Sequence, residues 1–398
     1  MGFSYLVAAS AGAASVVGDV VGKVTVGYQG WFSAPGDGSP VNAWGHGNLE
    51  MWPDVREYTT TYPTSHANLG DGRPARMFSS YDDQVVQTHF RWMAESGIDC
   101  AALQRFANEL QPGSRIKAQR DGMAVKVRQA AENAGRKFYI MYDTSGWGLR
   151  GLEADWTNTM INQLHLTSSP AYARQDGKPV VGVYGMGYVG WPATPQAALD
   201  VINWFKAQGC YVVGSVPGQW RMGTGDSRPD FAPVYSAFDL LSAWGVGRRM
   251  DAAYAPWIKG DRDFCLAHKI EYQPCIYPGT SFANTNGSGR NLIPRLHGDF
   301  MWFQFATLRS LGVKSVYIAM FDELNEATSI FKCAEDASML PTDHWLLPLD
   351  ADGVHVSSDF YLRLVKNGGL MLKGLIPYQA THTTPWVLPD QATPAAGP

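Results

Sequence analysis

The chain has 398 residues, of which 45% are apolar, enough for one large domain or two ordinary ones. Its 36 acidic and 32 basic residues give a net charge of −4, and no basic stripe is visible, so nucleic acid is not an expected partner. No apolar run reaches the roughly 20 residues that a membrane-spanning helix needs, so a membrane span is not expected either.

The five cysteines are scattered along the chain without a C-x-x-C pair. An odd number leaves at least one of them unpaired within a monomer, and the spacing typical of metal ligands is absent from the cysteines and histidines. We therefore expect a monomer that holds no metal and needs no other cofactor.

The two ends of the chain differ in composition from its middle. Residues 1–20 include a small, apolar stretch without a basic start, which is compatible with a trimmed export signal or with a plain N-terminal extension. Residues 379–398 are rich in Pro, Thr and Ala, as linkers and tails are. We expect one barrel domain over residues 21–378 in a secreted or periplasmic protein.

Short apolar segments alternate with amphipathic ones through most of the chain. The predicted strands are 24–31, 99–106, 137–143, 179–185, 211–216, 239–244, 271–277 and 316–321. The predicted helices are 80–97, 116–134, 153–166, 195–209, 253–268 and 296–311. Eight short buried strands, most followed by a helix, predict a closed (β/α)8 TIM barrel. An open doubly wound sheet is the alternative, although it would use fewer strands and a phosphate loop after the first.

A long polar segment, residues 33–78, follows the first predicted strand. It contains Trp44, His46 and Trp52, and it is too aromatic to be typical of a disordered segment. Loops of this length in compact domains usually carry function. We expect this insertion to form part of the wall of a binding site.

Three glycines after the fourth strand, Gly185, Gly187 and Gly190, spell G-x-G-x-x-G. In a dinucleotide site the helix begins inside this motif. Here Trp191 and Pro192 follow, and the helix begins only near Pro195, so we interpret the motif as a loop.

In a barrel, the residues that follow each strand gather on one rim, where such enzymes place their sites. Polar and aromatic residues are frequent at these positions and in the insertion. The predicted substrate-binding residues are Tyr28, Gln29, Trp31, Trp52, Gln104, Arg105, Asp143, Trp147, Tyr184, Trp220, Arg221, Trp244, Tyr277, Asp322 and Asn325. Carboxylates, amides, arginines and aromatic rings together are typical of a site for a polyhydroxyl compound, such as an oligosaccharide or a polysaccharide.

An acidic cluster follows the eighth strand directly: Asp322, Glu323 and Glu326. If the chain turns helically there, Glu323 and Glu326 share one face, with roughly 5–6 Å between their Cβ atoms. Such a pair suits two carboxyl groups that act on one bond. The residues alone leave a second interpretation open, since acidic clusters also occur in solvated loops and at helix N-termini.

Residues 321–328, F-D-E-L-N-E-A-T, resemble the acidic motif of the endo-α-mannosidases of glycoside hydrolase family 99, approximately F-N-E-W-H-E-G-T. The chain is also similar to bacterial proteins described as family 71/99-like. That similarity lies in Y-Q-G-W, M-W-P-D-V, F-S-S-Y and F-D-E-x-x-E-x-T-x-I-F-K, and it spans residues 22–332.

The resemblance implies a barrel and a retaining α-glycosidase. Carried over, Glu326 is the general acid/base, and Glu323 deprotonates the sugar's 2-hydroxyl, which then attacks the anomeric carbon. Leu324, Asn325 and Ala327 replace the family's Trp, His and Gly, so the chemistry is implied more directly than the mannose specificity. The alternatives are a non-catalytic carbohydrate-binding barrel and, on the same rim, a lyase or transglycosylase.

Overall fold

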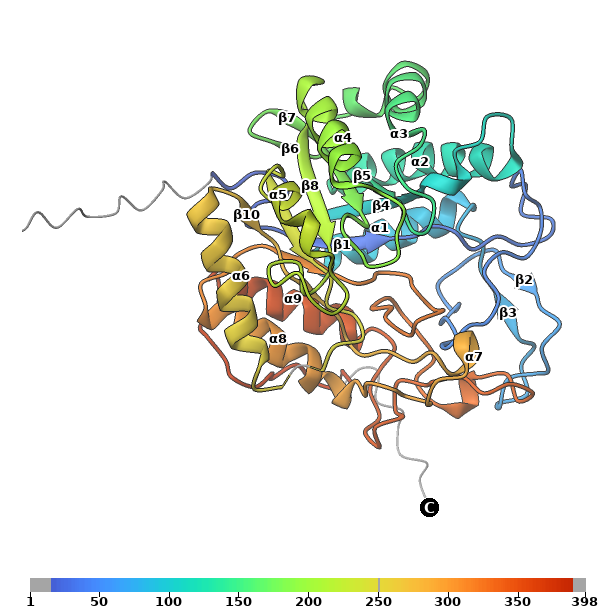
Figure 1. Ribbon diagram of the computed structural model, residues 1–398. Helices are drawn as coiled ribbons and strands as arrows, with labels where there is room; N and C mark the ends of the chain where they lie inside the picture. Colours follow the sequence, from blue (N-terminus) through green and yellow to red (C-terminus); the bar gives the residue numbers. More distant parts are fainter. Residues whose placement is uncertain (1–15, 250, 389–398) are drawn as a thin grey trace, which may run out of the picture.

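The parallel strands of this protein curl into an α/β barrel, as the alternating pattern predicts (Figure 1). The computed structural model describes residues 16–249 and 251–388. The strands pair in the order β10-β9-β8-β7-β5-β4-β1-β12-β11, and all these pairs are parallel. The wall strands are β1 (Val24–Tyr28), β4 (Cys100–Phe106), β5 (Lys137–Asp143), β7 (Lys178–Tyr184), β8 (Tyr211–Val216), β9 (Leu240–Ala243), β10 (Glu271–Tyr272), β11 (Cys275–Ile276) and β12 (Val316–Ile318).

The seventh wall position holds two short strands instead of the continuous strand predicted over 271–277. The ring closes there, because β10 pairs with β9 while β11 pairs with β12. Pro274 lies between the two and has no N–H to donate, which interrupts the ladder. Backbone contacts still run through the break: Gln273 N donates to Leu241 O (2.9 Å), and Tyr317 N donates to Pro274 O (3.0 Å).

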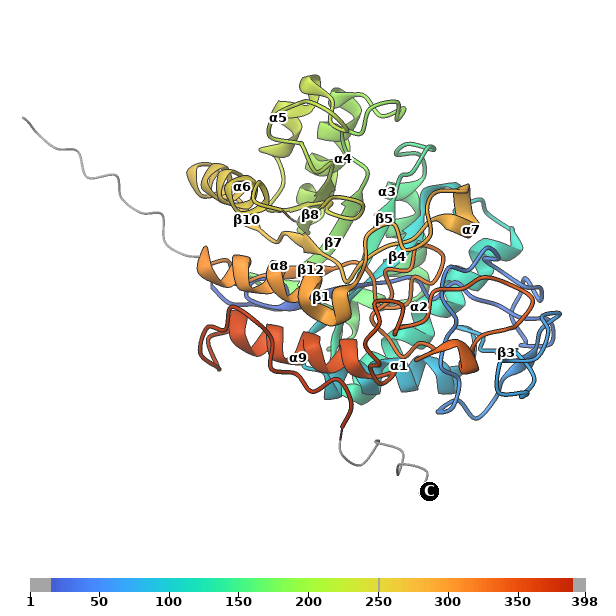
Figure 2. The ribbon, with the colours of Figure 1, turned by 90° about the horizontal axis from the view of Figure 1, so that it is seen from below.

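Helices cover the outside of the wall, as the two views of Figures 1 and 2 show. They are α1 (Asp83–Glu95), α2 (Arg115–Ala134), α3 (Leu152–Ala154), α4 (Pro195–Ala207), α5 (Ala232–Tyr235), α6 (Tyr254–His268), α8 (Asp299–Ser310) and α9 (Phe360–Leu372). The predicted helix over 153–166 is largely a π-helix, Asp155–Gln163, which continues α3. The remaining elements are α7 (Ala283–Asn286), the hairpin of β2 (Tyr62–Pro63) and β3 (Arg76–Met77), β6 (Arg174–Gln175) beside β7, and 3₁₀ turns at Ala107–Glu109, Leu166–Ser168, Pro229–Phe231, Leu296–Gly298 and Ala337–Met339.

The eighth covering helix, α9, was not predicted from the sequence. Gly368 and Gly369 lie in its middle, and glycine lowers helix propensity by about 1 kcal/mol relative to alanine. Gly368 serves packing, because a Cβ atom there would lie 2.6 Å from the ring of Phe305 in α8. The two helices therefore approach closely at this point.

The insertion over residues 33–78 is ordered, and it lies beside the segment that follows β12 (Figure 2). Isolated bridges join Pro53 to Cys333 and Leu69 to Pro341. A small second hydrophobic cluster fills the contact, and its buried members are Trp52, Leu69, Ala75, Ala334, Met339, Leu340 and Leu346. The insertion is thus a packed layer on one side of the barrel.

The described part of the predicted C-terminal tail packs against the barrel's covering helices. Trp302 Nε1 in α8 donates to Gln379 O (3.0 Å), and Ser357 N donates to Trp386 O (3.0 Å). Residues 379–388 therefore differ from the linker that their composition predicts, and residues 389–398 lie outside the described part, as do residues 1–15. Among the helices that the structure describes, none has the length and apolar character to cross a membrane.

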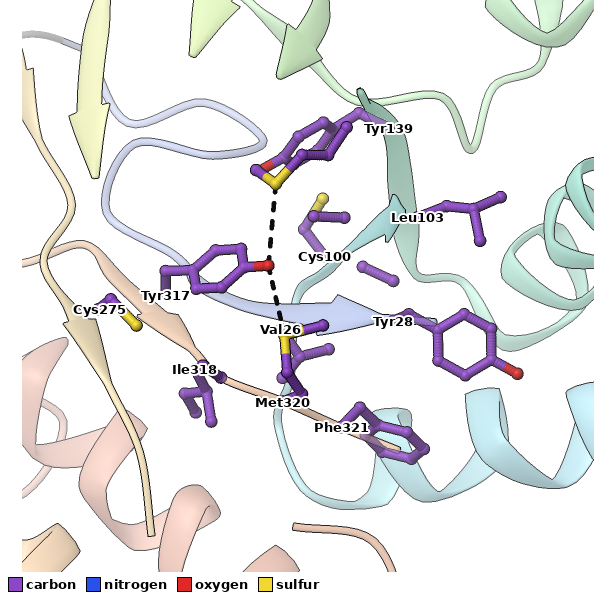
Figure 3. Close-up of a cluster of buried hydrophobic side chains, with 14 of the residues drawn as sticks. Val26, Tyr28, Cys100, Leu103, Tyr139, Cys275, Tyr317, Ile318, Met320 and Phe321 are labelled. Atoms are coloured by element: carbon purple, nitrogen blue, oxygen red, sulfur yellow. Dashed lines mark hydrogen bonds between the residues drawn. The ribbon is translucent and has the colours of Figure 1, made fainter. Parts of the chain in front are cut away.

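Side chains from the strands fill the barrel interior, so it is a packed core. Figure 3 shows the Tyr317 hydroxyl between two methionine sulfur atoms, at 3.8 Å from Met141 and 3.7 Å from Met320. Gly27 of β1 faces the same space, because a Cβ atom there would lie 2.2 Å from the Met320 sulfur. Side chains alternate along a strand, so residues two positions from Gly27 also point inward.

Candidate active site

This alternation decides which residues at the strand ends face the barrel axis. Tyr28 pairs with Leu103 in the register of β1 and β4, so Gln29 comes opposite Gln104. Gln104 Nε2 donates to the Tyr317 hydroxyl (3.3 Å), which places this amide inside the barrel. Gln29 lies on the same face, two residues beyond Gly27. The two glutamines therefore stand side by side at the inner mouth of the barrel.

Asp322 joins the end of β12 to the end of β1. Its two carboxylate oxygens accept hydrogen bonds from the backbone N–H groups of Gln29 and Gly30, both at 2.8 Å. Burial raises the pKa of Asp322 to about 6, although these two donors favour its ionised form. The side chain is fully buried with both oxygens engaged. We therefore correct Asp322 from a substrate ligand to a clamp that fixes the loop after β1.

Glu323 is held at both carboxylate oxygens. Oε2 accepts a hydrogen bond from Gln29 Nε2 (3.0 Å), and Oε1 accepts one from the backbone N–H of Asn325 (3.0 Å). Burial raises the pKa of Glu323 well above its ordinary value, and the charges of Glu326 and Asp322 raise it further. The two donors act in the opposite sense, because they favour the carboxylate.

Glu326 lies in a turn over residues 324–327, so the predicted helical turn does not continue into a helix. Its backbone oxygen accepts hydrogen bonds from Thr280 Oγ1 (2.7 Å) and Ser281 N (3.1 Å), which fix the turn to the loop after β11. The residue is half-buried. Burial raises the pKa of Glu326 to about 7, and the negative charge of Asp143 adds to this.

Asp143 and Tyr184 complete the group around Glu326. They are partners in the register of β5 and β7, so their side chains point to the same side of the wall. Asp143 accepts a hydrogen bond from Ser145 N (2.8 Å), and burial, followed by the charge of Glu109, raises its pKa. Burial also raises the pKa of Tyr184, with contributions from Asp143 and Glu326 among others. Trp244 lies against Tyr184, with ring centroids 5.1 Å apart.

Two predicted site residues point away from this group because they alternate with inward neighbours. Tyr28 is fully buried, and its hydroxyl bonds to His89 Nδ1 in α1 (2.9 Å). Arg105 is paired outside the wall with Asp155, through Nε and Nη2 at 2.6 Å each. Their neighbours Gln29 and Gln104 face inward instead. We therefore correct Tyr28 and Arg105 from rim residues to residues that join the wall to its covering helices.

Three further predicted residues are used by the loops themselves. Trp220 and Arg221 both bind the carboxylate of Asp261 in α6, at 3.1 and 2.9 Å. The Tyr277 hydroxyl donates to the backbone oxygen of Arg248. Trp220 and Tyr277 are also almost fully buried. The structure therefore corrects Trp220 and Tyr277 from substrate contacts to loop contacts, whereas Arg221 also lines a hollow and stays a predicted binding residue.

The aromatic residues of the insertion line a separate pocket of about 320 Å³. Trp52 contributes to its floor, although most of this side chain is buried in the second hydrophobic cluster. Trp31 stacks on His46 with centroids 3.8 Å apart, and burial lowers the pKa of His46 to about 4. Asn325 Nδ2 donates to the backbone oxygen of Gly47, which brings this pocket next to the acidic turn. Trp147 lies elsewhere on the rim, exposed after β5.

The sequence analysis missed Glu50, which connects the insertion to the loop that supports Glu326. The Glu50 carboxylate accepts hydrogen bonds from Ser281 Oγ (2.8 Å), Asn284 N (2.6 Å) and Thr285 N (2.9 Å). More than 230 residues separate the partners, so no local pattern could reveal the contact. Its neighbour Trp52 drew attention instead, because aromatic residues are conspicuous in a loop.

Among residues 16–249 and 251–388, no three His, Cys, Asp or Glu side chains are grouped so that they could hold a metal ion. In the acidic group at the barrel mouth, N–H donors hold the carboxylates of Asp322, Glu323 and Asp143 instead.

Comparison with known proteins identifies the fold. No protein-family model matches the chain, and no curated protein matches it. The endo-alpha-mannosidase of family GH99 from Bacteroides thetaiotaomicron superposes with a TM-score of 0.65 at 14% identity, covering 89% of this chain and 98% of that one. Its complex with bis-tris-propane gives 0.64 at 13% identity with the same coverage. A glycoside hydrolase-like protein gives 0.53 at 15%, covering 90% and 97%.

These matches cover 89–90% of this chain. At such low identity the likeness shows the fold. It confirms the barrel and the structural resemblance to family 99 that the motif implies.

Proposed function

We propose that this protein is a retaining glycoside hydrolase that cleaves α-linked glycosidic bonds in an oligosaccharide or polysaccharide. Glu326 is the general acid/base, and Glu323 is the carboxylate that assists attack. The observation that carries the proposal is the unequal environment of these two carboxyl groups. Each carboxylate oxygen of Glu323 accepts a hydrogen bond from an N–H group. The pKa of Glu326, by contrast, is set by burial and by the charge of Asp143, without a hydrogen bond to its carboxyl group among the causes.

The unequal environments separate the roles. N–H donors stabilise a carboxylate, so hydrogen bonding favours a negative charge on Glu323, although burial and the charges of Glu326 and Asp322 act against it. Burial raises the pKa of both groups, the charges of Glu326 and Asp322 raise that of Glu323 further, and the charge of Asp143 raises that of Glu326, so the pair holds a proton near neutral pH. With a pKa of about 7, Glu326 can deliver that proton at neutral pH, which is the condition for an efficient general acid.

The proposed reaction follows from these protonation states. Glu326 donates its proton to the leaving glycosidic oxygen while Glu323 takes the proton from the 2-hydroxyl of the sugar. The 2-oxygen then bonds to the anomeric carbon, and the bond to the leaving oxygen breaks. Water opens the resulting ring, with Glu326 now accepting the water proton, and Glu323 returns its proton to the 2-oxygen. Two inversions at one carbon give net retention.

Polar inward side chains around the pair support a sugar as substrate. Gln29, Gln104 and Tyr184 face the barrel mouth beside Asp143, and Trp244 offers an aromatic face next to Tyr184. Hydroxyl groups of a sugar need such donors and acceptors, while its C–H faces pack on aromatic rings.

A panel of soluble α-mannans, α-glucans and other α-glycans tests the function. Release of reducing ends is expected from a class whose 2-hydroxyl is trans to the cleaved bond, as in α-mannans, because the 2-oxygen must attack from the face opposite the leaving oxygen; α-glucans, in which it is cis, are the control. NMR of the first product should show the same anomeric configuration as the cleaved bond. An inverted product would contradict the proposed roles. Binding without release from any glycan would favour the non-catalytic carbohydrate-binding barrel.

A further inference from the structure

We propose that the loops after β4, β5 and β7 form a second saccharide-binding surface, centred on Trp147, that holds further units of an extended glycan. We call it the Trp147 surface, and it consists of Gln111, Trp147, Arg150, Asn158, Gln163 and Pro192. The proposal rests on the proposed function for its substrate class, and it adds that the substrate is a chain that extends well beyond the cleaved bond.

Trp147 is exposed but rigidly held. Its side chain has 43% of its surface exposed. The backbone N–H groups of Trp147 and Gly148 both donate to Thr144 O at 3.1 Å, and Thr144 Oγ1 donates to Tyr184 O in β7 (2.9 Å). Gly146 and Gly148 have φ of +65° and +87°, which glycine adopts without strain. These bonds fix the backbone of the turn, so little of its conformational entropy is lost when a ligand stacks on the exposed indole.

A hollow lies against Trp147 on each of two sides. The first, of about 650 Å³, lies between the loop before α2 and the π-helix that follows α3. The second, of about 470 Å³, lies toward the start of α4 and includes Pro192. Trp147 and Arg150 line both hollows. An exposed ring between two hollows can stack on a sugar from either direction.

The first hollow is chemically suited to a saccharide. Exposed amide side chains of Gln111, Asn158 and Gln163 border it and can both donate to and accept from hydroxyl groups. On its floor Lys117 and Asp121 pair at 2.8 Å. Arg105 and Asp155 pair beneath them at 2.6 Å, so two positive and two negative charges balance there. The floor is electrically balanced, and Arg150, which also lines the hollow, adds one positive charge at its edge, so the amide groups and the aromatic wall are what suit the hollow to a saccharide.

The centre of the Trp147 surface follows Asp143 of the acidic group closely along the chain. Asp143, whose charge acts on Glu326, ends β5 only four residues before Trp147. The turn between them is bonded to Tyr184, which is itself part of the group around Glu326. A glycan bound at Glu326 that leaves the mouth on the Asp143 side therefore meets Trp147 next.

Affinity for long and short glycans in the Glu326→Gln protein tests this surface. Soluble α-mannan and α-glucan, together with the corresponding trisaccharides, are titrated into that protein with and without Trp147→Ala. Losing a stacked aromatic anchor should raise Kd for the bound polysaccharide about tenfold. The trisaccharide is too short to reach from the acidic group around Glu326 to the Trp147 surface, so its Kd should change by no more than about twofold. Trp147→Phe should restore most of the polysaccharide affinity.

Trp386→Ala is the matched control, since this indole is 47% exposed but lies on the C-terminal segment. It should leave both Kd values unchanged. Unchanged polysaccharide binding after Trp147→Ala, or an equal loss for both ligand lengths, would overturn the Trp147 surface, and so would a parent protein that binds neither polysaccharide. Cleavage of the polysaccharides by the Glu326→Gln protein at the wild-type rate would instead overturn the proposed catalytic roles while leaving the Trp147 comparison valid.

Discussion

The side-chain amide of Gln29 donates a hydrogen bond to Glu323 Oε2 over 3.0 Å, although 294 residues separate the two in the chain. The contact joins the first and the last strand of the barrel wall. Among the described residues, Gln29 is the only one whose side chain donates to Glu323. Asp322 holds the same strand end, because it accepts a hydrogen bond from the backbone N–H of Gln29. The geometry of the acidic group thus depends on barrel closure.

Removing this donor should change the pH dependence of activity. In Gln29→Ala the carboxylate of Glu323 loses a charge-assisted hydrogen bond, so its pKa rises and the acidic limb of the kcat/KM profile should move up by about one pH unit. Gln104→Ala is the matched control, because Gln104 is the cross-strand neighbour that bonds to Tyr317 instead. An unshifted limb in Gln29→Ala would show that this amide does not tune Glu323.

The charge of Asp143 should influence the pH at which activity falls on the basic side of the pH profile. Because its negative charge helps to raise the pKa of Glu326, Asp143→Asn should lower that pKa from about 7. Activity requires protonated Glu326, so the basic limb should then fall at lower pH than in the wild type. Asp226→Asn is the control. Asp226 lies on the loop after β8, and it pairs with Arg248. A basic limb that moves equally in both variants would argue against a specific effect of Asp143.

Glu326 should lower the stability of the folded protein at alkaline pH. Its pKa is about 7 in the fold, against an ordinary value of 4.5. A raised carboxyl pKa means that the protonated group contributes stability fully below about pH 4.5, and that this contribution is lost as pH rises through 7. Glu326→Gln stays neutral. At pH 8 its free energy of unfolding, measured by urea denaturation, should therefore exceed that of the wild type by about 1–3 kcal/mol. At pH 4.5 the two proteins should be similar.

Glu50 should act on turnover through the loop that supports Glu326. Glu50→Ala leaves Ser281, Asn284 and Thr285 without their acceptor, and an unsatisfied buried donor costs about 1–3 kcal/mol. We expect a lower unfolding midpoint and a kcat reduced about tenfold, since a small displacement of a catalytic group has effects of this order. Wild-type kcat in a correctly folded Glu50→Ala protein would show that the loop does not position Glu326.

The sequence predicts the barrel well because its signals are local. Apolar runs and helix caps mark nearly every wall element, and the acidic turn follows the last strand directly. The rim residues were predicted less well, because adjacent pairs such as Tyr28 with Gln29 and Arg105 with Gln104 were treated alike. Strand alternation sends one of each pair outward, and only a fixed register says which one.

Long-range contacts explain part of what the sequence did not reveal. The bonds of Glu50 depend on partners far along the chain, whereas the break at Pro274 has a local cause, since proline has no N–H. Deleting residues 41–54 would be one test of whether the insertion forms a wall of the binding site. Residues 50–54 are buried against the segment after β12, however, so this deletion would disrupt packing as well as any binding. Single substitutions are therefore the sharper test of the insertion.

The comparison of Glu326→Gln with Glu323→Gln on two substrates tests the central assignment most directly. One α-glycoside carries a poor, sugar leaving group, and the other carries an aryl group that leaves without protonation. Loss of the general acid should reduce cleavage of the first about 10²–10⁴-fold and leave most of the bond-breaking rate on the second. Glu323→Gln should be slow on both, because it impairs attack. Equal losses on both substrates for both variants, or wild-type rates in either variant, would contradict the roles proposed for this pair.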